Sequence, residues 1–140
     1  MTDLLDDIAR YVLQARGEFV TRVAIDGADG AGKTRFAASL AHRLDAWGVG
    51  VMRASVDGFH QPRAVRYRRG RYSAEGFYSD SYDYPALKRL LLDPLSPGGA
   101  GKYVSAAFDH VTDRRVSVEP RLARPGMCSC SMVSSLTAQN

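Results

Sequence analysis

The residues best suited to chemistry lie in one short segment: Gly27, Ala28, Asp29, Gly30, Ala31, Gly32, Lys33 and Thr34. Their order fits the phosphate-binding pattern G-x-x-x-x-G-K-[ST] at every fixed position. Glycines let several backbone N–H groups converge on a phosphate, because no Cβ blocks the approach. Lys33 can neutralise the β- and γ-phosphates, and the Thr34 hydroxyl can bind Mg²⁺. We therefore predict that this segment binds ATP with Mg²⁺ and that Lys33 also takes part in catalysis.

Two predicted strands and a helix must position this segment. Residues 21–26 are mostly β-branched or apolar, as in a buried strand, and the apolar residues of 33–47 recur at helical spacing. Residues 51–56 form a second predicted strand, so the two strands of this βαβ unit should be parallel. Since the carboxyl ends of parallel strands meet at one edge, Asp57 should lie beside the phosphate-binding segment. Asp57 could then be the base for an attacking hydroxyl, with a plain turn or N-cap aspartate as the open alternative.

A polar segment, residues 60–80, is rich in arginine. Five arginines fall within nine residues, with tyrosines between them: Arg63, Arg66, Arg68, Arg69 and Arg71. We predict an irregular loop that binds an anion over the active site, because arginine binds phosphate groups in a bidentate manner. Stacking of these side chains on nucleic acid is one alternative, and a solvated charged loop is another.

Composition is that of an ordinary soluble globular protein, with 45% hydrophobic and 24% charged residues in 140. This length suits one modest domain. The net charge of +4 is concentrated in the arginine-rich segment, so a phosphate-bearing small substrate explains it as well as nucleic acid does. We expect a cytoplasmic protein, because there is no apolar run of membrane-spanning length and no signal-peptide pattern. Cys128 and Cys130 have no partner pair for a zinc site, and we interpret them as incidental.

The other segments predict further short elements. We expect an amphipathic helix at 3–16, a helix at 84–92 with Asp83 as its N-cap, and two short strands at 102–109 and 115–118 around a turn.

Ordered motifs across residues 20–120 resemble the uridine kinase and phosphoribulokinase group of P-loop kinases. The phosphate-binding segment is joined by Asp57-Gly58-Phe59-His60, by Ser81-Tyr82-Asp83-Tyr84-Pro85 and by Phe108-Asp109-His110-Val111-Thr112-Asp113. The resemblance implies an α/β fold, with a parallel P-loop NTPase-type sheet flanked by helices. It also implies ATP-dependent transfer of the γ-phosphate to a hydroxyl of a small molecule, a nucleoside first among them.

The resemblance also implies roles for the matching residues. Asp57 would be the catalytic base, and Asp83 would contact the acceptor hydroxyls, with helix capping as its alternative role. Phe59 and His60 belong to the Asp57-Gly58-Phe59-His60 motif and are expected to contact the acceptor, although His60 stands where uridine kinases usually have tyrosine. Arg63 and Arg66 are expected to face the substrate, without a residue-by-residue match.

Two functions of other kinds remain open: a nucleic-acid-associated P-loop ATPase, and a non-catalytic nucleotide-binding remnant. Binding to oligonucleotides with a steep salt dependence would favour the first, and nucleotide binding without turnover the second. We expect a small-molecule partner, no nucleic acid and no membrane, and the sequence does not indicate an oligomeric state.

The C-terminal tail departs from the resemblance. We expect residues 1–125 to be the N-terminal part of a P-loop kinase domain and 126–140 to be a disordered tail without a core strand. In a shifted reading frame, the third base of each codon is read together with the first two bases of the next codon. From residue 127 onward this frame permits Val-Leu-Leu-Phe-Asp-Gly-Val-Phe, which contains a buried strand that ends in Asp-Gly. We therefore hypothesise a frameshift near Pro125 or Gly126 and a truncated, weakly active enzyme.

Overall fold

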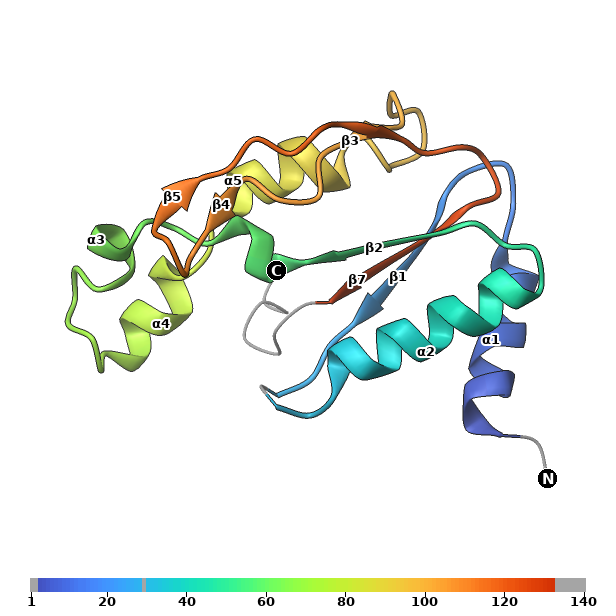
Figure 1. Cartoon of the computed structure of the whole chain (residues 1–140), viewed down its shortest axis with the longest axis horizontal. Coiled ribbons are helices and arrows are strands. Elements are labelled where there is room, and N and C mark those ends of the chain that lie inside the picture. Colours follow the sequence, from blue (N-terminus) through green and yellow to red (C-terminus); the bar gives the residue numbers. More distant parts are fainter. Residues whose placement is uncertain (1–2, 29, 133–140) are drawn as a thin grey trace.

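The computed structural model describes residues 3–28 and 30–132 (Figure 1). Its helices are α1 (Leu4–Ala15), α2 (Lys33–Ala46), α3 (Arg63–Arg66), α4 (Ala74–Asp80) and α5 (Tyr84–Leu87), with a 3₁₀ turn η1 (Val56–Phe59) and a π-helical segment η2 (Lys88–Leu92). Its strands are β1 (Thr21–Ile25), β2 (Val51–Ser55), β3 (Lys102–Tyr103), β4 (Phe108–Asp109), β5 (Arg114–Arg115), β6 (Arg121–Leu122) and β7 (Cys128–Met132).

A parallel sheet with the strand order β1-β7-β2 forms the centre of the molecule. Both outer strands pair with β7, so β1 and β2 are parallel, as predicted. Ile25 and Ser55, the last residues of β1 and β2, are both opposite Met132. The segments that follow the two strands therefore leave the sheet from the same edge.

The expectation that the tail after residue 125 lacks a core strand is wrong for Cys128–Met132. Backbone hydrogen bonds extend the ladder on both sides of β7: the Cys128 N–H donates to the Gly50 carbonyl (2.8 Å) and the Thr21 N–H to the Met127 carbonyl (3.0 Å). Cys128, Ser129 and Cys130 are buried. Small side chains allow this mixed sequence to occupy a buried position. Residues 133–140 lie outside the described part of the chain, and the division at residue 125 stays a prediction.

Two apolar clusters cover the two faces of this sheet. On one face α1 and α2 pack against the cysteines of β7, with Leu40, Leu44 and Val49 fully buried. On the other face α5 and η2 pack over β2 and η1, around the fully buried Phe59 and nearly buried Leu91. Figure 1 shows α2 below the sheet and α5 above it. Among the described helices, none is long and apolar enough to cross a membrane.

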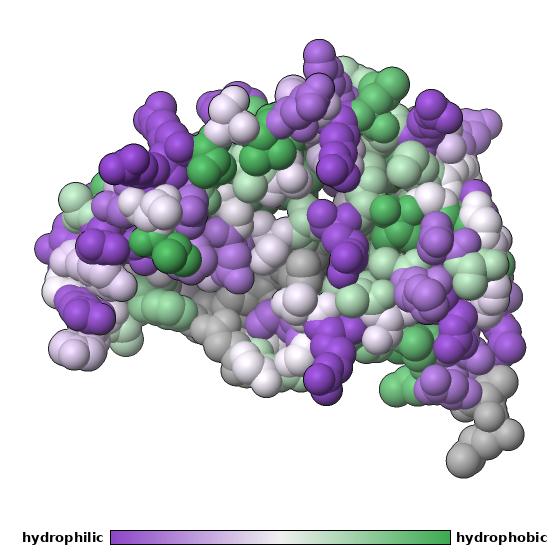
Figure 2. Space-filling view, viewed as in Figure 1, coloured by the Kyte–Doolittle hydropathy of each residue, from purple (hydrophilic) through white to green (hydrophobic). Residues whose placement is uncertain are grey.

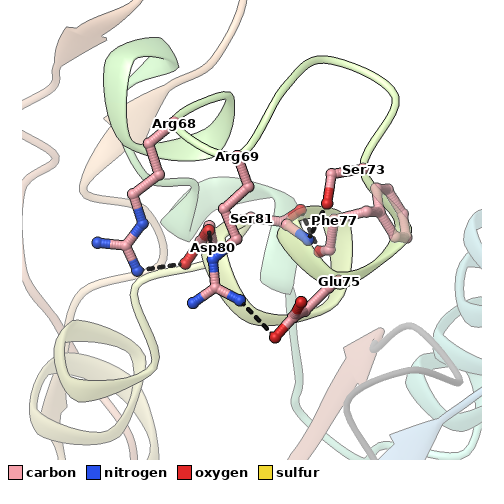
Figure 3. Close-up of polar contacts among 8 residues, drawn as sticks. Arg68, Arg69, Ser73, Glu75, Phe77, Asp80 and Ser81 are labelled. Carbon is pink, nitrogen blue, oxygen red and sulfur yellow. Dashed lines mark hydrogen bonds and ion pairs between the residues drawn. The ribbon is translucent and has the colours of Figure 1, made fainter.

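The arginine-rich segment contains helices, which corrects the prediction of an irregular loop. The Ser73 hydroxyl caps α4 by accepting from the Gly76 N–H (3.0 Å). Asp80, whose side chain is only 1% exposed, ends α4 and accepts from Arg68 (2.6 Å) (Figure 3). It also forms an ion pair with Arg69, whose Nε lies 3.2 Å from the other carboxylate oxygen. The hydrogen bond from Arg68 is the main reason that the pKa of Asp80 lies below its usual value.

The second half of the chain forms short antiparallel pairs. The expected turn between two strands is present: β4 pairs with β5, and Asp113 in the turn has a left-handed φ of 56°. The long expected strand at 102–109 is instead two short ones, because β3 turns away to pair with β6.

Candidate active site

The phosphate-binding segment connects β1 to α2, as predicted. Its conformation requires glycine, because Gly30 and Gly32 have φ values of 78° and 95°. The Lys33 ammonium folds back over the loop and donates to the carbonyls of Gly27 (2.5 Å) and Ala28 (3.1 Å). Asp29 lies outside the described residues. The predicted strand, loop and helix are therefore all present around this motif.

The first turn of α2 fits an anion. This helix has 14 residues, and its N-cap, Gly32, provides no side chain to accept from the first backbone N–H groups. These N–H groups and the positive end of the helix dipole favour a bound phosphate. A Cβ built on Gly30 or Gly32 would meet no other part of the described chain within 4 Å, apart from its sequence neighbours. A cavity of about 420 Å³ adjoins the loop and is lined in part by Asp26 and Lys33.

The side chains of Asp57, His60, Tyr82 and His110 form a second feature, which we call the Asp57 cluster. The Asp57 carboxylate lies 3.5 Å from His60 Nε2 and accepts from the Tyr82 hydroxyl at 3.5 Å. The His110 ring packs on the His60 ring with centroids 4.3 Å apart. The hydrogen bond with His60 is the largest cause that lowers the pKa of Asp57, and burial opposes it. Asp57 is 65% exposed and ionised at neutral pH, so it can accept a proton.

Backbone contacts assemble this cluster from separate parts of the chain. The Asp83 N–H donates to the Phe59 carbonyl (2.7 Å), and the backbones of His60 and Tyr82 form an isolated antiparallel β-bridge. The Ala107 N–H donates to the Gly58 carbonyl (2.8 Å). A Cβ on Gly58 would lie 2.9 Å from Ala106 Cβ, so glycine is required between Asp57 and Phe59. The Asp-Gly-Phe-His motif thus combines a reactive side chain with a close backbone contact.

Asp83 and Phe59, which were predicted to contact the substrate, have structural roles. Asp83 caps α5, since its carboxylate accepts from the Ala86 N–H at 3.0 Å, and Phe59 is fully buried in the core. Both also line a cavity of about 290 Å³ together with His60, Arg89 and Arg115. Contact of Asp83 and Phe59 with an acceptor therefore stays a prediction.

The two arginines predicted to face the substrate have different surroundings. Arg63 is exposed, and its backbone N–H donates to the Asp113 carboxylate (2.7 Å). Arg66 is buried to all but 11% of its side chain, and one guanidinium nitrogen lies 4.0 Å from the same carboxylate. A single aspartate in the β4–β5 turn thus fixes α3 at the side of the Asp57 cluster. On the face shown in Figure 2, hydrophilic side chains predominate over β5 and α3.

Three residues of this region were not predicted as site residues: Tyr82, His110 and Asp113. Tyr82 and His110 lie within motifs that carry the family resemblance, which was the available signal. Asp113 also ends one of these motifs, but nothing in the sequence indicates its contact with α3, which joins positions 50 residues apart.

Comparison with known proteins supports the fold. No protein-family model matches the chain, and no curated protein matches it. A solved structure described as a possible uridine kinase from Bacillus stearothermophilus matches with a TM-score of 0.77 and 23% sequence identity. The match covers 92% of this chain and 69% of that chain. The chain therefore has the α/β fold of uridine kinase-like P-loop kinases, with a parallel sheet flanked by helices.

Proposed function

We propose that this protein is an ATP-dependent kinase that transfers the γ-phosphate to a hydroxyl of a small molecule, with a nucleoside as the first candidate acceptor. One observation carries the proposal. The phosphate-binding loop and Asp57 follow two parallel strands that end opposite the same residue, Met132. A phosphate donor bound by the loop and the carboxylate of Asp57 would therefore meet at one edge of the sheet.

The loop residues from Gly27 to Thr34 would hold ATP with Mg²⁺. Uncapped N–H groups of α2 and the Lys33 ammonium fit phosphate oxygens, and the Thr34 hydroxyl suits Mg²⁺. Bound Mg²⁺ would neutralise charge on the phosphates. Lys33 would exchange its present carbonyl partners for phosphate oxygens, which is a small movement of a flexible side chain.

Asp57 would accept the proton of the acceptor hydroxyl. The acceptor oxygen then bonds to the γ-phosphorus while the bond from that phosphorus to the bridging oxygen of ADP breaks. Asp57 retains the proton until the phosphorylated product leaves. The contacts from His60 and Tyr82 hold the carboxylate in position and keep it ionised before the reaction.

The arginine-rich segment gives less support to the nucleic-acid alternative. Arg68 and Arg69 are paired with Asp80, and Arg69 is also paired with Glu75 (2.8 Å). Much of the positive charge of this segment therefore stabilises α4. Binding to oligonucleotides should be weak and nonspecific.

The test is ADP release from Mg·ATP against a panel of small alcohols, with Asp57→Asn as the variant and Asp45→Asn as the control. Asp45 is exposed on α2, and its substitution removes the same charge. Loss of a general base should lower kcat by about 10²- to 10⁴-fold. Affinity for a non-hydrolysable ATP analogue should stay unchanged. Equal turnover by the two variants would exclude Asp57 as the base.

A further inference from the structure

A small cavity lies beside the Asp57 cluster, between α3 and α4. Its volume is about 90 Å³, and its lining includes His60, Arg66, Tyr67, Arg71, Phe77 and Ser81. A water molecule takes about 30 Å³ in the liquid, so this space suits roughly three waters or one small polar group. We call it the α3–α4 cavity.

Two residues that line this cavity carry buried polar atoms without partners. Neither Arg66 Nε nor His60 Nδ1 has a hydrogen-bond partner among the described residues, although both atoms are fully buried. Arg66 Nε always carries a proton, and buried donors of this kind are nearly always hydrogen-bonded. A ligand with an acceptor oxygen would satisfy it.

The charge of the lining specifies the ligand. Arg66 and Arg71 both line the cavity, and none of the described carboxylates does. The carboxylate of Asp113 approaches Arg66 only to 4.0 Å, and it also accepts from the Arg63 N–H (2.7 Å). A positive cavity with an unpartnered guanidinium donor suits an oxyanion, since guanidinium groups bind carboxylate and phosphoryl oxygens strongly.

His60 is next to both the cavity and the proposed base, Asp57. His60 lines the cavity, and its Nε2 lies 3.5 Å from the Asp57 carboxylate. One imidazole ring therefore separates the position of a reacting hydroxyl from the position of a bound oxyanion. An acceptor that contacts both must therefore extend past this ring, from the Asp57 carboxylate to the cavity.

Resting on the proposed kinase function, we propose that the α3–α4 cavity binds an oxyanionic group of the acceptor, so that the substrate is an acidic alcohol carrying a carboxylate or phosphoryl group. Arg66 is then a specificity-determining residue. Its Nε donates to the oxyanion, and Arg71 adds a second positive charge at the more exposed side. The acceptor would then be an acidic alcohol and not a neutral nucleoside.

The binding test uses inorganic phosphate and the ¹H–¹⁵N signal of the Arg66 Nε–H group, which Arg66→Lys removes and thereby assigns. Mg²⁺ with a non-hydrolysable ATP analogue is present throughout, so that the phosphate-binding loop is occupied. We expect a saturable shift of this signal in the millimolar range. The Nε–H signal of the exposed Arg124 should not move. Absence of a saturable shift at Arg66 would overturn the inference.

The activity test compares alcohols that differ only in an acidic group: glycerol with glycerate and glycerol 3-phosphate, and ribose with ribose 5-phosphate. The acidic member should have a kcat/KM about 10- to 100-fold higher, which is the usual effect of one charge-assisted hydrogen bond. Arg66→Gln should abolish this preference, Arg71→Gln should reduce it, and Arg124→Gln should leave it unchanged.

The outcomes separate this inference from the proposed function. Turnover of neutral and acidic alcohols at equal rates, with phosphate bound at Arg66, would mean that the cavity takes a free anion, and would overturn the assignment of the acceptor. Turnover of neutral alcohols alone would overturn it while the kinase function stands. Phosphate binding at Arg66 without turnover of any alcohol would support the oxyanion site and contradict the kinase function.

Discussion

The phosphate-binding loop and the Asp57 cluster are built in opposite ways. The loop is one continuous segment whose backbone forms the site, and its lysine contacts carbonyls only five and six residues away. The cluster combines side chains from three segments, and its partners Asp57 and Tyr82 are 25 residues apart. A local site needs little tertiary structure, whereas an assembled site needs the whole fold. Nucleotide binding should therefore be more robust than acceptor binding.

The largest expected effect concerns β7, on which both regions depend. If the frameshift hypothesis is correct, the restored strand Val-Leu-Leu-Phe-Asp-Gly would bury large apolar side chains where Cys128, Ser129 and Cys130 now lie. Each buried Leu or Phe contributes about 1.5–3 kcal/mol, so the restored chain should be several kcal/mol more stable to urea. Sequencing the coding DNA comes first. The hypothesis is wrong if no single-base insertion or deletion near codons 125 and 126 restores this strand.

Lys33→Ala should break the loop without disturbing the cluster. Loss of a charge-assisted hydrogen bond to phosphate should weaken binding of an ATP analogue by about 10- to 100-fold in calorimetry. The matched control is Lys88→Ala. Lys88 is exposed on η2 and forms an ion pair with Asp93, the residue that follows this segment. Equal affinities of the two variants would contradict the role of Lys33.

Gly58→Ala should break the cluster without disturbing the loop. The added Cβ would lie 2.9 Å from both Ala106 Cβ and the Ser105 carbonyl oxygen. Overpacking of this kind costs about 1–3 kcal/mol in the free energy of unfolding, measured by urea denaturation. Gly17→Ala is the control, because a Cβ there meets nothing within 4 Å. If Gly58→Ala lowered the affinity for ATP as much as it lowered turnover of the acceptor, the loop and the Asp57 cluster would not be independent.

The smallest effect is a change in pH dependence. His60 is the main cause that lowers the pKa of Asp57, and Tyr82 is a minor one. His60→Phe removes the hydrogen bond that favours the carboxylate, so the pKa should rise and the acid limb of kcat should move to higher pH. Tyr82→Phe should move it less, in the same direction. A limb that moves to lower pH would show that another group titrates.

The local nature of the phosphate-binding loop explains why the sequence predicted the strand before it and the helix after it. Its fixed residues are consecutive, and the strand and helix around them have regular apolar spacing. Asp57 was placed at the correct edge because the two strands of a βαβ unit are parallel, so both end at the same edge of the sheet. The contacts of His60 with Tyr82 and His110 depend on backbone pairings between distant segments, which no local pattern encodes.

The helices α3 and α4 and the strand β7 were missed for separate physical reasons. The helices α3 and α4 are short and lack an apolar stripe, and ion pairs with Asp80 hold α4 in place. Ion pairs of this kind leave no periodic signal. Strand β7 alternates cysteine and serine, which does not resemble a buried parallel strand, and only its two neighbours make it one.

The position of β7 in the sheet also determines the order of events during synthesis. It is the last described strand to leave the ribosome, yet it lies between β1 and β2, which do not pair with each other. Until residue 132 is available, the nascent chain carries two strands without a backbone partner. Such a chain exposes apolar surface until β7 has been synthesised and relies on chaperones or on rapid synthesis of this strand. Slow codons between β2 and β7 should therefore lower the soluble yield more than slow codons between β1 and β2.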